Sequence, residues 1–202
     1  MNRSLRIIVA DDERDTRDFF QQFLSLQGHQ VLATAQTGRH LVEQCRLLHP
    51  DLVITDIKMP DMDGIDAAGE IYKDAPIPVI LVSTYHNREL IERAAVNHVL
   101  AYLVKPIKET DLEPAIGIAM KRFEEFQTLR QEATDLRQAL EDRKVIERAK
   151  GIIMRRGRLD EPEAFRRLQR LASDKSRKLV EIAQMILVAE EAFQAADKSK
   201  AE

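Results

Sequence analysis

Three carboxylates, a hydroxyl and an ammonium group each follow a short apolar run of the sequence. They are Asp11 and Asp12 after 7–10, Asp56 after 52–55, Ser83 after 78–82, and Lys105 after 101–104. If these runs are strands of a parallel α/β sheet, their C-terminal ends converge on one crevice. The pattern therefore predicts a site for a divalent cation and a phosphoryl group.

These residue types suit phosphoryl transfer. Mg²⁺ prefers carboxylate and carbonyl oxygens and keeps several waters, so Asp11, Asp12 and Asp56 are candidate ligands whose mutual repulsion a cation relieves. Carboxylates also form acyl phosphates, which makes Asp56 a candidate nucleophile. Lys105 offers a fixed positive charge and Ser83 a hydrogen-bond donor, because such chemistry depends on positioning and charge neutralisation.

Short β-branched runs alternate with amphipathic stretches over residues 5–120. Strands are predicted near 5–10, 30–35, 51–55, 78–83 and 101–104, and helices near 14–27, 37–48, 64–73, 88–96 and from 111 onward. This alternation predicts an α/β fold in which a five-stranded, doubly wound parallel sheet is covered on both faces.

Composition excludes several classes of protein. The chain has 202 residues, enough for one or two domains, and none of its apolar runs approaches the roughly 20 residues that span a bilayer. The N-terminus leads directly into a strand, so we expect no signal peptide and no membrane association. The lone Cys45 excludes an internal disulfide framework and predicts a cytoplasmic location.

Charge is distributed unevenly. Residues 1–120 hold 12 basic and 18 acidic residues, a net charge of −6, whereas 121–202 hold 19 and 16, a net charge of +3. The segment 143–178 carries 13 basic and 5 acidic residues. Such a segment is either a solvated helical face or a surface that binds a polyanion.

A helix of unusual length is predicted from residue 111. Thr110 to Glu113 is typical of a capping box, and Pro114 falls in the first turn, where proline is tolerated. The first predicted C-cap is Gly157. Apolar residues at spacings of three and four favour a dimeric coiled-coil seam over packing within the chain; they are Phe126, Leu129, Ala133, Leu136 and Leu140.

Two more helices are predicted after Gly157. Asp160 is the expected N-cap of the first, and the second extends over 179–193. The predicted division is a phosphoacceptor domain at 1–120, a helical or coiled-coil linker at 121–140, a small three-helix all-α domain at 141–194 and a frayed tail at 195–202.

Residues 5–120 resemble the receiver domain of two-component response regulators. The resemblance rests on the joint pattern of Asp-Asp, Asp with Met-Pro-Asp-Met-Asp-Gly beyond it, Ser-Thr and Lys-Pro after successive strands. It implies a flavodoxin-like strand order of 2-1-3-4-5. It also implies that a histidine kinase phosphorylates Asp56, and that Mg²⁺ binds Asp11, Asp12, Asp56 and the backbone carbonyl of Lys58.

The same resemblance assigns the remaining roles. Ser83 is the hydroxyl that moves to meet the phosphoryl group, and Tyr102 is the aromatic switch that couples this movement to the surface. Lys105 is the site lysine, and its bond to Pro106 is commonly cis in the family. Thr84 departs from the small residue usual at its position, so we expect it to crowd access to the site.

The C-terminal third resembles the ANTAR domain, an RNA-binding module of transcription antitermination regulators. The resemblance rests on residues 145–154, 164–172 and 178–183. It implies binding to paired stem-loops in messenger RNA leaders, by shape, stacking and backbone contacts. The candidate RNA-binding residues are Lys150, Arg155, Arg156, Arg167, Arg170, Lys175, Arg177 and Lys178.

Together these patterns predict a non-enzymatic regulator that dimerises on phosphorylation and binds RNA hairpins. The alternative is a DNA-binding response regulator, although the last helix is acidic and poorly suited to a major groove. Phosphatases with an aspartyl nucleophile carry a second Asp two residues later, where this chain has Lys58. A protein-interaction output without nucleic acid also stays open.

Overall fold

The computed structural model describes residues 4–84, 88–97 and 99–198. The chain forms two compact units, which meet in sequence between Gln127 and Thr128. Within the described residues, no helix is both long and apolar enough to cross a membrane.

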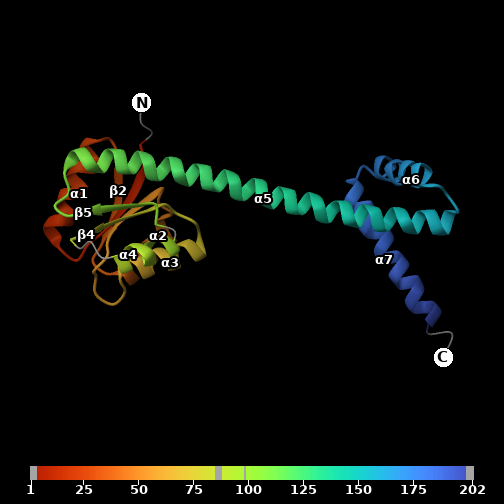
Figure 1. Cartoon of the computed structure of the whole chain (residues 1–202), viewed down its shortest axis with the longest axis horizontal. Coiled ribbons are helices and arrows are strands. Elements are labelled where there is room, and N and C mark those ends of the chain that lie inside the picture. Colours follow the sequence, from red (N-terminus) through yellow and green to blue (C-terminus); the bar gives the residue numbers. More distant parts are fainter. Residues whose placement is uncertain (1–3, 85–87, 98, 199–202) are drawn as a thin grey trace. The chain divides into compact units, whose positions relative to one another are not determined.

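The order of elements is the predicted one (Figure 1). It is β1 Arg6–Ala10, α1 Arg14–Leu26, β2 Gln30–Ala35, α2 Gly38–Leu48, β3 Leu52–Asp56, α3 Gly64–Asp74, β4 Val79–Ser83, α4 Arg88–Val96, β5 Ala101–Val104, α5 Glu109–Gly157, α6 Glu161–Asp174 and α7 Leu179–Lys198. The predicted elements of 5–120 lie within two residues of these bounds.

The five strands form one parallel sheet in the order β2-β1-β3-β4-β5, as expected. Ala10 is paired with Thr55, and Asp56 with Val82, so the C-terminal ends of neighbouring strands lie in register. Because all strands run the same way, the residues that follow them emerge at one edge of the sheet. The predicted α/β fold class is confirmed.

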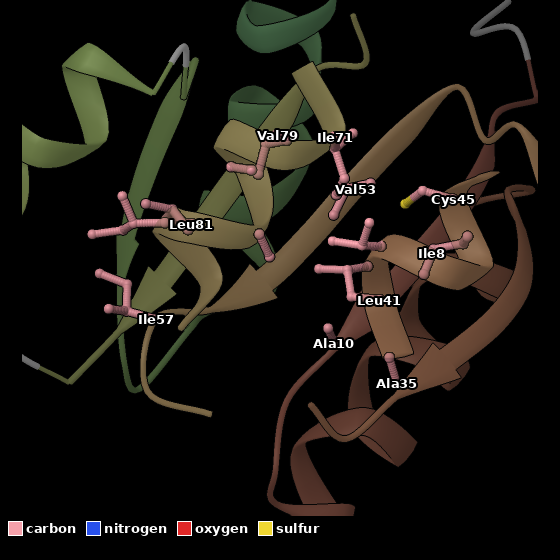
Figure 2. Close-up of a cluster of buried hydrophobic side chains, with 14 of the residues drawn as sticks. Ile8, Ala10, Ala35, Leu41, Cys45, Val53, Ile57, Ile71, Val79 and Leu81 are labelled. Carbon is pink, nitrogen blue, oxygen red and sulfur yellow. The ribbon is translucent and has the colours of Figure 1, made fainter. Parts of the chain in front are cut away.

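Helices cover both faces of this sheet. Alternate residues of β1 enter different apolar clusters: Ile8 and Ala10 pack with α2, α3 and α4, and Ile7 and Val9 pack with α1 and the start of α5. Figure 2 shows the first cluster, in which the Cys45 sulfur lies among aliphatic side chains. Burial raises the pKa of the Cys45 thiol to about 12, so this cysteine is an unreactive part of the core.

The long helix α5 differs from its prediction at both ends. It begins at Glu109, so Thr110 lies inside the first turn and the predicted capping box is wrong; the Lys108 carbonyl accepts from the Asp111 backbone N–H instead. The helix ends at Gly157 as predicted, but the left-handed residue is Arg158, with φ of 51°. A side chain at position 157 would press on Leu159.

The predicted domain boundaries at 120 and 140 both fall inside α5, so no break in secondary structure marks either, and this division stays a prediction. The large apolar members of the predicted heptad seam are exposed along α5; Leu136, for example, is 66% exposed. α7 extends to Lys198, beyond the expected start of the frayed tail, and residues 199–202 lie outside the described residues.

The second unit has a small core of its own. Leu168 of α6 is fully buried with Ala149 of α5 and with Ile182 and Ala183 of α7. Asp160 caps α6 as predicted, because its carboxylate accepts from the Glu163 backbone N–H at 2.8 Å. Alanines at the centre of this cluster let the helices approach closely.

We expect Leu168→Ala to destabilise the second unit by about 2–5 kcal/mol, because it removes the largest fully buried side chain of this core and leaves a cavity. Chemical denaturation followed by circular dichroism measures the loss. Gln169→Ala, an exposed change on the same helix, is the control. Equal stability of the two variants would contradict this account of the core.

Candidate phosphoryl site and basic surface

The predicted phosphoryl-site residues meet at the C-terminal edge of the sheet. Asp56 is the last residue of β3 and Ser83 the last of β4. The Lys105 backbone N–H donates to the Ser83 carbonyl at 2.8 Å, which extends the ladder beyond β5. The Lys105–Pro106 peptide bond is cis, as the resemblance to receiver domains implied.

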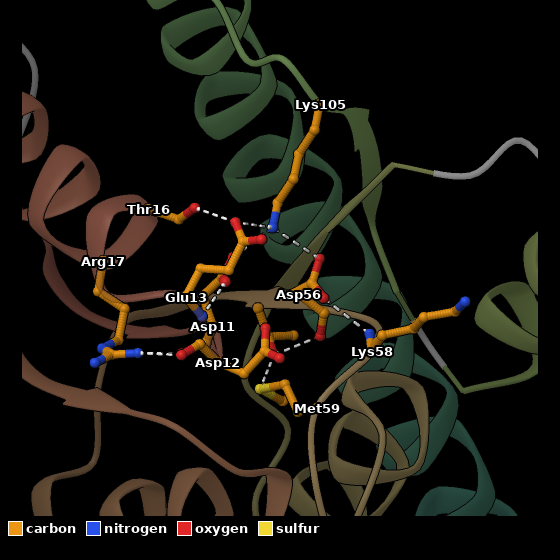
Figure 3. Close-up of polar contacts among 10 residues, drawn as sticks. Asp11, Asp12, Glu13, Thr16, Arg17, Asp56, Lys58, Met59 and Lys105 are labelled. Carbon is orange, nitrogen blue, oxygen red and sulfur yellow. Dashed lines mark hydrogen bonds and ion pairs between the residues drawn. The ribbon is translucent and has the colours of Figure 1, made fainter.

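The ammonium group of Lys105 contacts a carboxylate that directly follows β1 and another at the end of β3. Figure 3 shows its ion pair with Asp56. Its Nζ lies 2.8 Å from Oδ2 of Asp11 and 3.2 Å from Oδ1 of Asp56. Asp11 is fully buried and Asp56 is 7% exposed. The sheet therefore brings three of the predicted residues into direct contact in a region largely shielded from solvent.

Backbone groups complete the surroundings of Asp56. Its Oδ2 accepts from the Lys58 backbone N–H at 2.9 Å, and its carbonyl accepts from the Thr55 hydroxyl at 3.0 Å. Gly64 is required here, because a β-carbon at that position would collide with the Asp56 carbonyl oxygen. The segment between Asp56 and α3 can thus fold closely over the end of β3.

Burial and charge act in opposite directions on these groups. Burial raises the pKa of Asp56 above the ordinary aspartate value; the charge of Lys105 lowers it, and the charge of Asp11 raises it. Burial lowers the pKa of Lys105, but hydrogen bonds and charge from Asp11 and Asp56 outweigh burial and leave that pKa raised. Lys105 is therefore a persistent cation beside Asp56.

The donor set is suited to Mg²⁺. Mg²⁺ is often bound through one or two carboxylates, with water and phosphate oxygens completing its shell. Asp11 and Asp56 approach the same ammonium nitrogen, and Asp12 is an exposed neighbour at the same edge. Among the described residues, however, no three His, Cys, Asp or Glu side chains are grouped closely enough to hold a metal ion by themselves.

The remaining receiver candidates lie on the neighbouring strands. Ser83 is buried at the end of β4, and Tyr102 of β5 is partly buried against the cluster that contains α3 and α4. Thr84 is exposed and lines an open depression with Glu13 and Lys105. Thr84 thus shares this depression with the site lysine, and its expected crowding of access to Asp56 stays a prediction.

One positioned residue was missed from the sequence. Arg17 is 8% exposed, and its Nη1 donates to the carbonyls of Asp11 at 2.7 Å and Asp12 at 2.9 Å. A signal was available, because Arg17 precedes Phe20 by three positions and Leu24 by seven, and therefore lies on the core-facing side of α1. An arginine on that side needs local acceptors.

The candidate RNA-binding residues fall into two groups. Seven of them have exposed side chains: Arg155, Arg156, Arg167, Arg170, Lys175, Arg177 and Lys178. Lys150 differs, because it is 7% exposed and its Nζ lies 2.6 Å from Glu147 and 2.7 Å from Glu161. Lys150 therefore connects α5 to the start of α6 rather than presenting a free charge.

Arginines also surround an open depression of about 580 Å³ on α6. Arg167 and Arg170 line it as predicted candidates, and Arg166 is a third arginine that the sequence reasoning did not select. Leu159 and Leu171 add an apolar surface. Nearby, Arg156 pairs with Glu190 at 2.9 Å and lies over the Phe193 ring, so its charge is already partly compensated.

Comparison with known proteins agrees with both halves of this description. The sequence profile of the response regulator receiver domain matches residues 7–117, and that of the ANTAR domain matches 134–187. The transcriptional regulatory protein PdtaR of Mycobacterium tuberculosis is 40% identical over 182 residues, which cover 90% of this chain and 89% of PdtaR.

Solved structures resemble the receiver part. A CheY-like response regulator receiver domain protein from Methanospirillum hungatei is 27% identical, with a TM-score of 0.57, over 61% of this chain and 98% of its own. A DNA-binding response regulator of the LuxR family from Staphylococcus aureus is 31% identical, with a TM-score of 0.55, over 57% and 98%. The receiver profile spans more than half of the sequence, and the chain therefore belongs to the two-component response regulators, with an ANTAR domain following its receiver domain.

Proposed function

We propose that a histidine kinase phosphorylates Asp56, and that the phosphorylated protein binds RNA stem-loops in messenger leaders and so controls transcription termination. The observation that carries this proposal is the contact of one lysine ammonium group, that of Lys105, with both Asp11 and Asp56. The ANTAR match and the exposed basic side chains support the RNA-binding part.

The geometry suits transfer of a phosphoryl group to Asp56. A carboxylate oxygen attacks phosphorus, and the new O–P bond forms as the bond to the donor breaks, leaving an acyl phosphate. Lys105 can donate to a phosphoryl oxygen and offset its charge. Mg²⁺, when held by Asp11, Asp12, Asp56 and the Lys58 carbonyl, supplies further charge neutralisation.

The phosphoryl group would also bias a two-state switch. In the phosphorylated state the Ser83 hydroxyl moves to donate to a phosphoryl oxygen, and Tyr102 changes rotamer with it. A modification shifts such an equilibrium only through contacts that differ between the two states. Ser83 and Tyr102 supply that difference, because Ser83 ends β4 at the site and Tyr102 of β5 packs against the apolar cluster that includes Ala94 of α4.

The output is a basic surface that reads RNA. Arg167 and Arg170 are our preferred contacts because they are exposed beside an apolar surface, where a guanidinium can bind a phosphate or stack on a base. Lys150 contributes by connecting α5 to α6. Glu181, Glu190 and Glu191 make α7 a poor helix for a DNA major groove.

We predict that nucleic-acid binding depends on these arginines and that the protein prefers RNA to DNA. Acetyl-phosphate-treated protein should bind a two-hairpin leader RNA more tightly than duplex DNA of equal length across a salt series. Arg170→Ala should weaken RNA binding about fivefold or more, which corresponds to at least about 1 kcal/mol.

Arg137→Ala is the matched control, because Arg137 is also exposed but lies on α5 outside the basic segment. Equal binding of RNA and DNA with steep salt dependence would show only a nonspecific basic surface. A preference for duplex DNA would replace our proposal with the DNA-binding alternative.

Phosphorylation is predicted to promote a dimer through the apolar seam on α5. Acetyl phosphate should shift the wild-type protein towards a dimer in analytical ultracentrifugation, and Asp56→Ala should abolish the shift. Leu136→Asn should abolish it too, since it removes an exposed seam residue. Leu26→Asn, which changes an even more exposed leucine on α1, should leave the shift intact. If Leu136→Asn still dimerises on phosphorylation, the dimer contact lies outside this seam.

The pKa of Asp56 predicts a pH effect. In metal-free protein, a carbon-13 NMR titration of the Asp56 carboxyl should give a midpoint above the ordinary value of about 3.9. Lys105→Met should raise the midpoint further, since it removes the ammonium charge that favours the carboxylate. A midpoint at or below the ordinary value would contradict the burial that we describe.

The raised pKa has a defined consequence for stability. Ionised Asp56 is less favourable in the folded protein than in the unfolded chain, so its charge costs stability above the folded pKa. Asp56→Asn mimics the protonated acid and should therefore raise the free energy of unfolding at neutral pH. This gain should disappear as the pH falls below the ordinary carboxyl value.

A further inference from the structure

Arg17 holds the backbone of the loop that carries the acidic pair. It lies in the first turn of α1, and its guanidinium turns back towards the end of β1 (Figure 3). A single nitrogen, Nη1, donates to the carbonyls of Asp11 at 2.7 Å and Asp12 at 2.9 Å. Two successive peptide groups are thereby fixed by one side chain.

These contacts are built into the fold. Arg17 is 8% exposed although its side chain is charged, and burying a guanidinium is costly unless its donors are satisfied. Hydrogen bonds that involve a charged donor are also stronger than neutral ones. Both acceptors are carbonyl oxygens of the loop, so breaking the contact would remove these bonds from two loop carbonyls as well as from the arginine.

Fixing the two peptide groups fixes where the carboxylates can point. Asp11 directs Oδ1 to the Glu13 backbone N–H at 3.0 Å and Oδ2 to Lys105 at 2.8 Å. Asp12 and Glu13 follow directly, so three carboxylates occupy consecutive positions and repel one another. Without an anchor, that repulsion would favour loop conformations that separate Asp12 from Asp11.

We propose that Arg17 is the positioning residue of the Mg²⁺ site, which it serves by holding the carbonyls of Asp11 and Asp12 so that their carboxylates face the cation. The proposal rests on the proposed function, since that function requires the cation. Arg17 itself does not touch the metal. Residues that orient ligands in this way commonly change metal affinity about 10–100-fold when removed.

Positioning and simple electrostatics predict opposite changes in Mg²⁺ affinity when Arg17 is removed. Arg17 is a cation near a cation site, so charge alone predicts that removing it tightens Mg²⁺ binding. Loss of positioning predicts weaker binding. Arg14 separates the two effects, because it lies on the same first turn and has the same charge, but is 84% exposed and faces Asp18 at 3.6 Å.

The test is Mg²⁺ binding to the unphosphorylated full-length protein, measured by isothermal titration calorimetry. Arg17→Met should weaken Mg²⁺ binding about tenfold or more, whereas Arg14→Met should leave it unchanged or slightly tighter. The backbone amides of Glu13 and Lys58 donate to the carboxylates of Asp11 and Asp56, and their NMR signals therefore report on the site. At low Mg²⁺ these signals should lose their Mg²⁺-dependent shifts only in Arg17→Met.

Arg17→Lys keeps the proposal testable if Arg17→Met does not fold. Its charge is unchanged, so any loss of Mg²⁺ affinity relative to wild type reports geometry, and we expect a loss smaller than that of Arg17→Met. Wild-type affinity in Arg17→Lys, or equal affinity in Arg17→Met and Arg14→Met, would overturn the positioning role alone. Failure of the wild-type protein to bind Mg²⁺ would overturn the proposed phosphoryl site and this role with it.

Discussion

The contact of the Lys105 ammonium with Asp11 and Asp56 is the interaction on which the receiver site depends. One carboxylate directly follows β1 and the other ends the adjacent strand β3. Both carry the same charge and are almost completely shielded from solvent. Their repulsion is poorly screened there. β4 lies between β3 and β5 in the sheet, so the lysine must reach across the end of β4, and its long unbranched side chain allows this.

The surrounding backbone is adapted to that contact. Arg17 ties down the loop after β1, the Lys58 N–H meets Asp56, and Gly64 lets the next segment fold against the end of β3. Each of these involves the main chain: two carbonyls accept from Arg17, the backbone N–H of Lys58 donates to Asp56, and the missing side chain of Gly64 leaves room for the Asp56 carbonyl. The carboxylates are thus held by the main chain around them as well as by their counterion.

Lysine serves a different purpose in the second unit. Lys150 is enclosed by Glu147 and Glu161, and its ion pairs join the end of α5 to the start of α6. The exposed arginines of α6 keep their charge available to a partner. The same charge therefore stabilises the helical unit where it is buried and forms an exposed basic surface where it is not.

The sequence alone determined the order of helices and strands in residues 5–120 and the residues that form the phosphoryl site. Periodicity of apolar residues predicted the order and type of every element in 5–120, because burial on one face or both imposes that spacing. The positions of Asp11, Asp56 and Lys105 at the ends of apolar runs predicted that they form one site, because the C-terminal ends of parallel strands share an edge. The structure places the three in contact. The matches at 7–117 and 134–187 confirm the receiver and ANTAR resemblances.

Tertiary structure decided which charged side chains are buried and at which residue each helix begins and ends. Thr110 resembled a cap but lies inside α5, and the left-handed residue after that helix is Arg158 rather than Gly157. Lys150 is indistinguishable from its basic neighbours in sequence, yet it is buried against two glutamates. The spacing of Arg17 from Phe20 and Leu24 indicated the core-facing side of α1, but only the structure showed which carbonyls it binds. Residue type sets which interactions are possible, and the packing of distant segments selects which of them form.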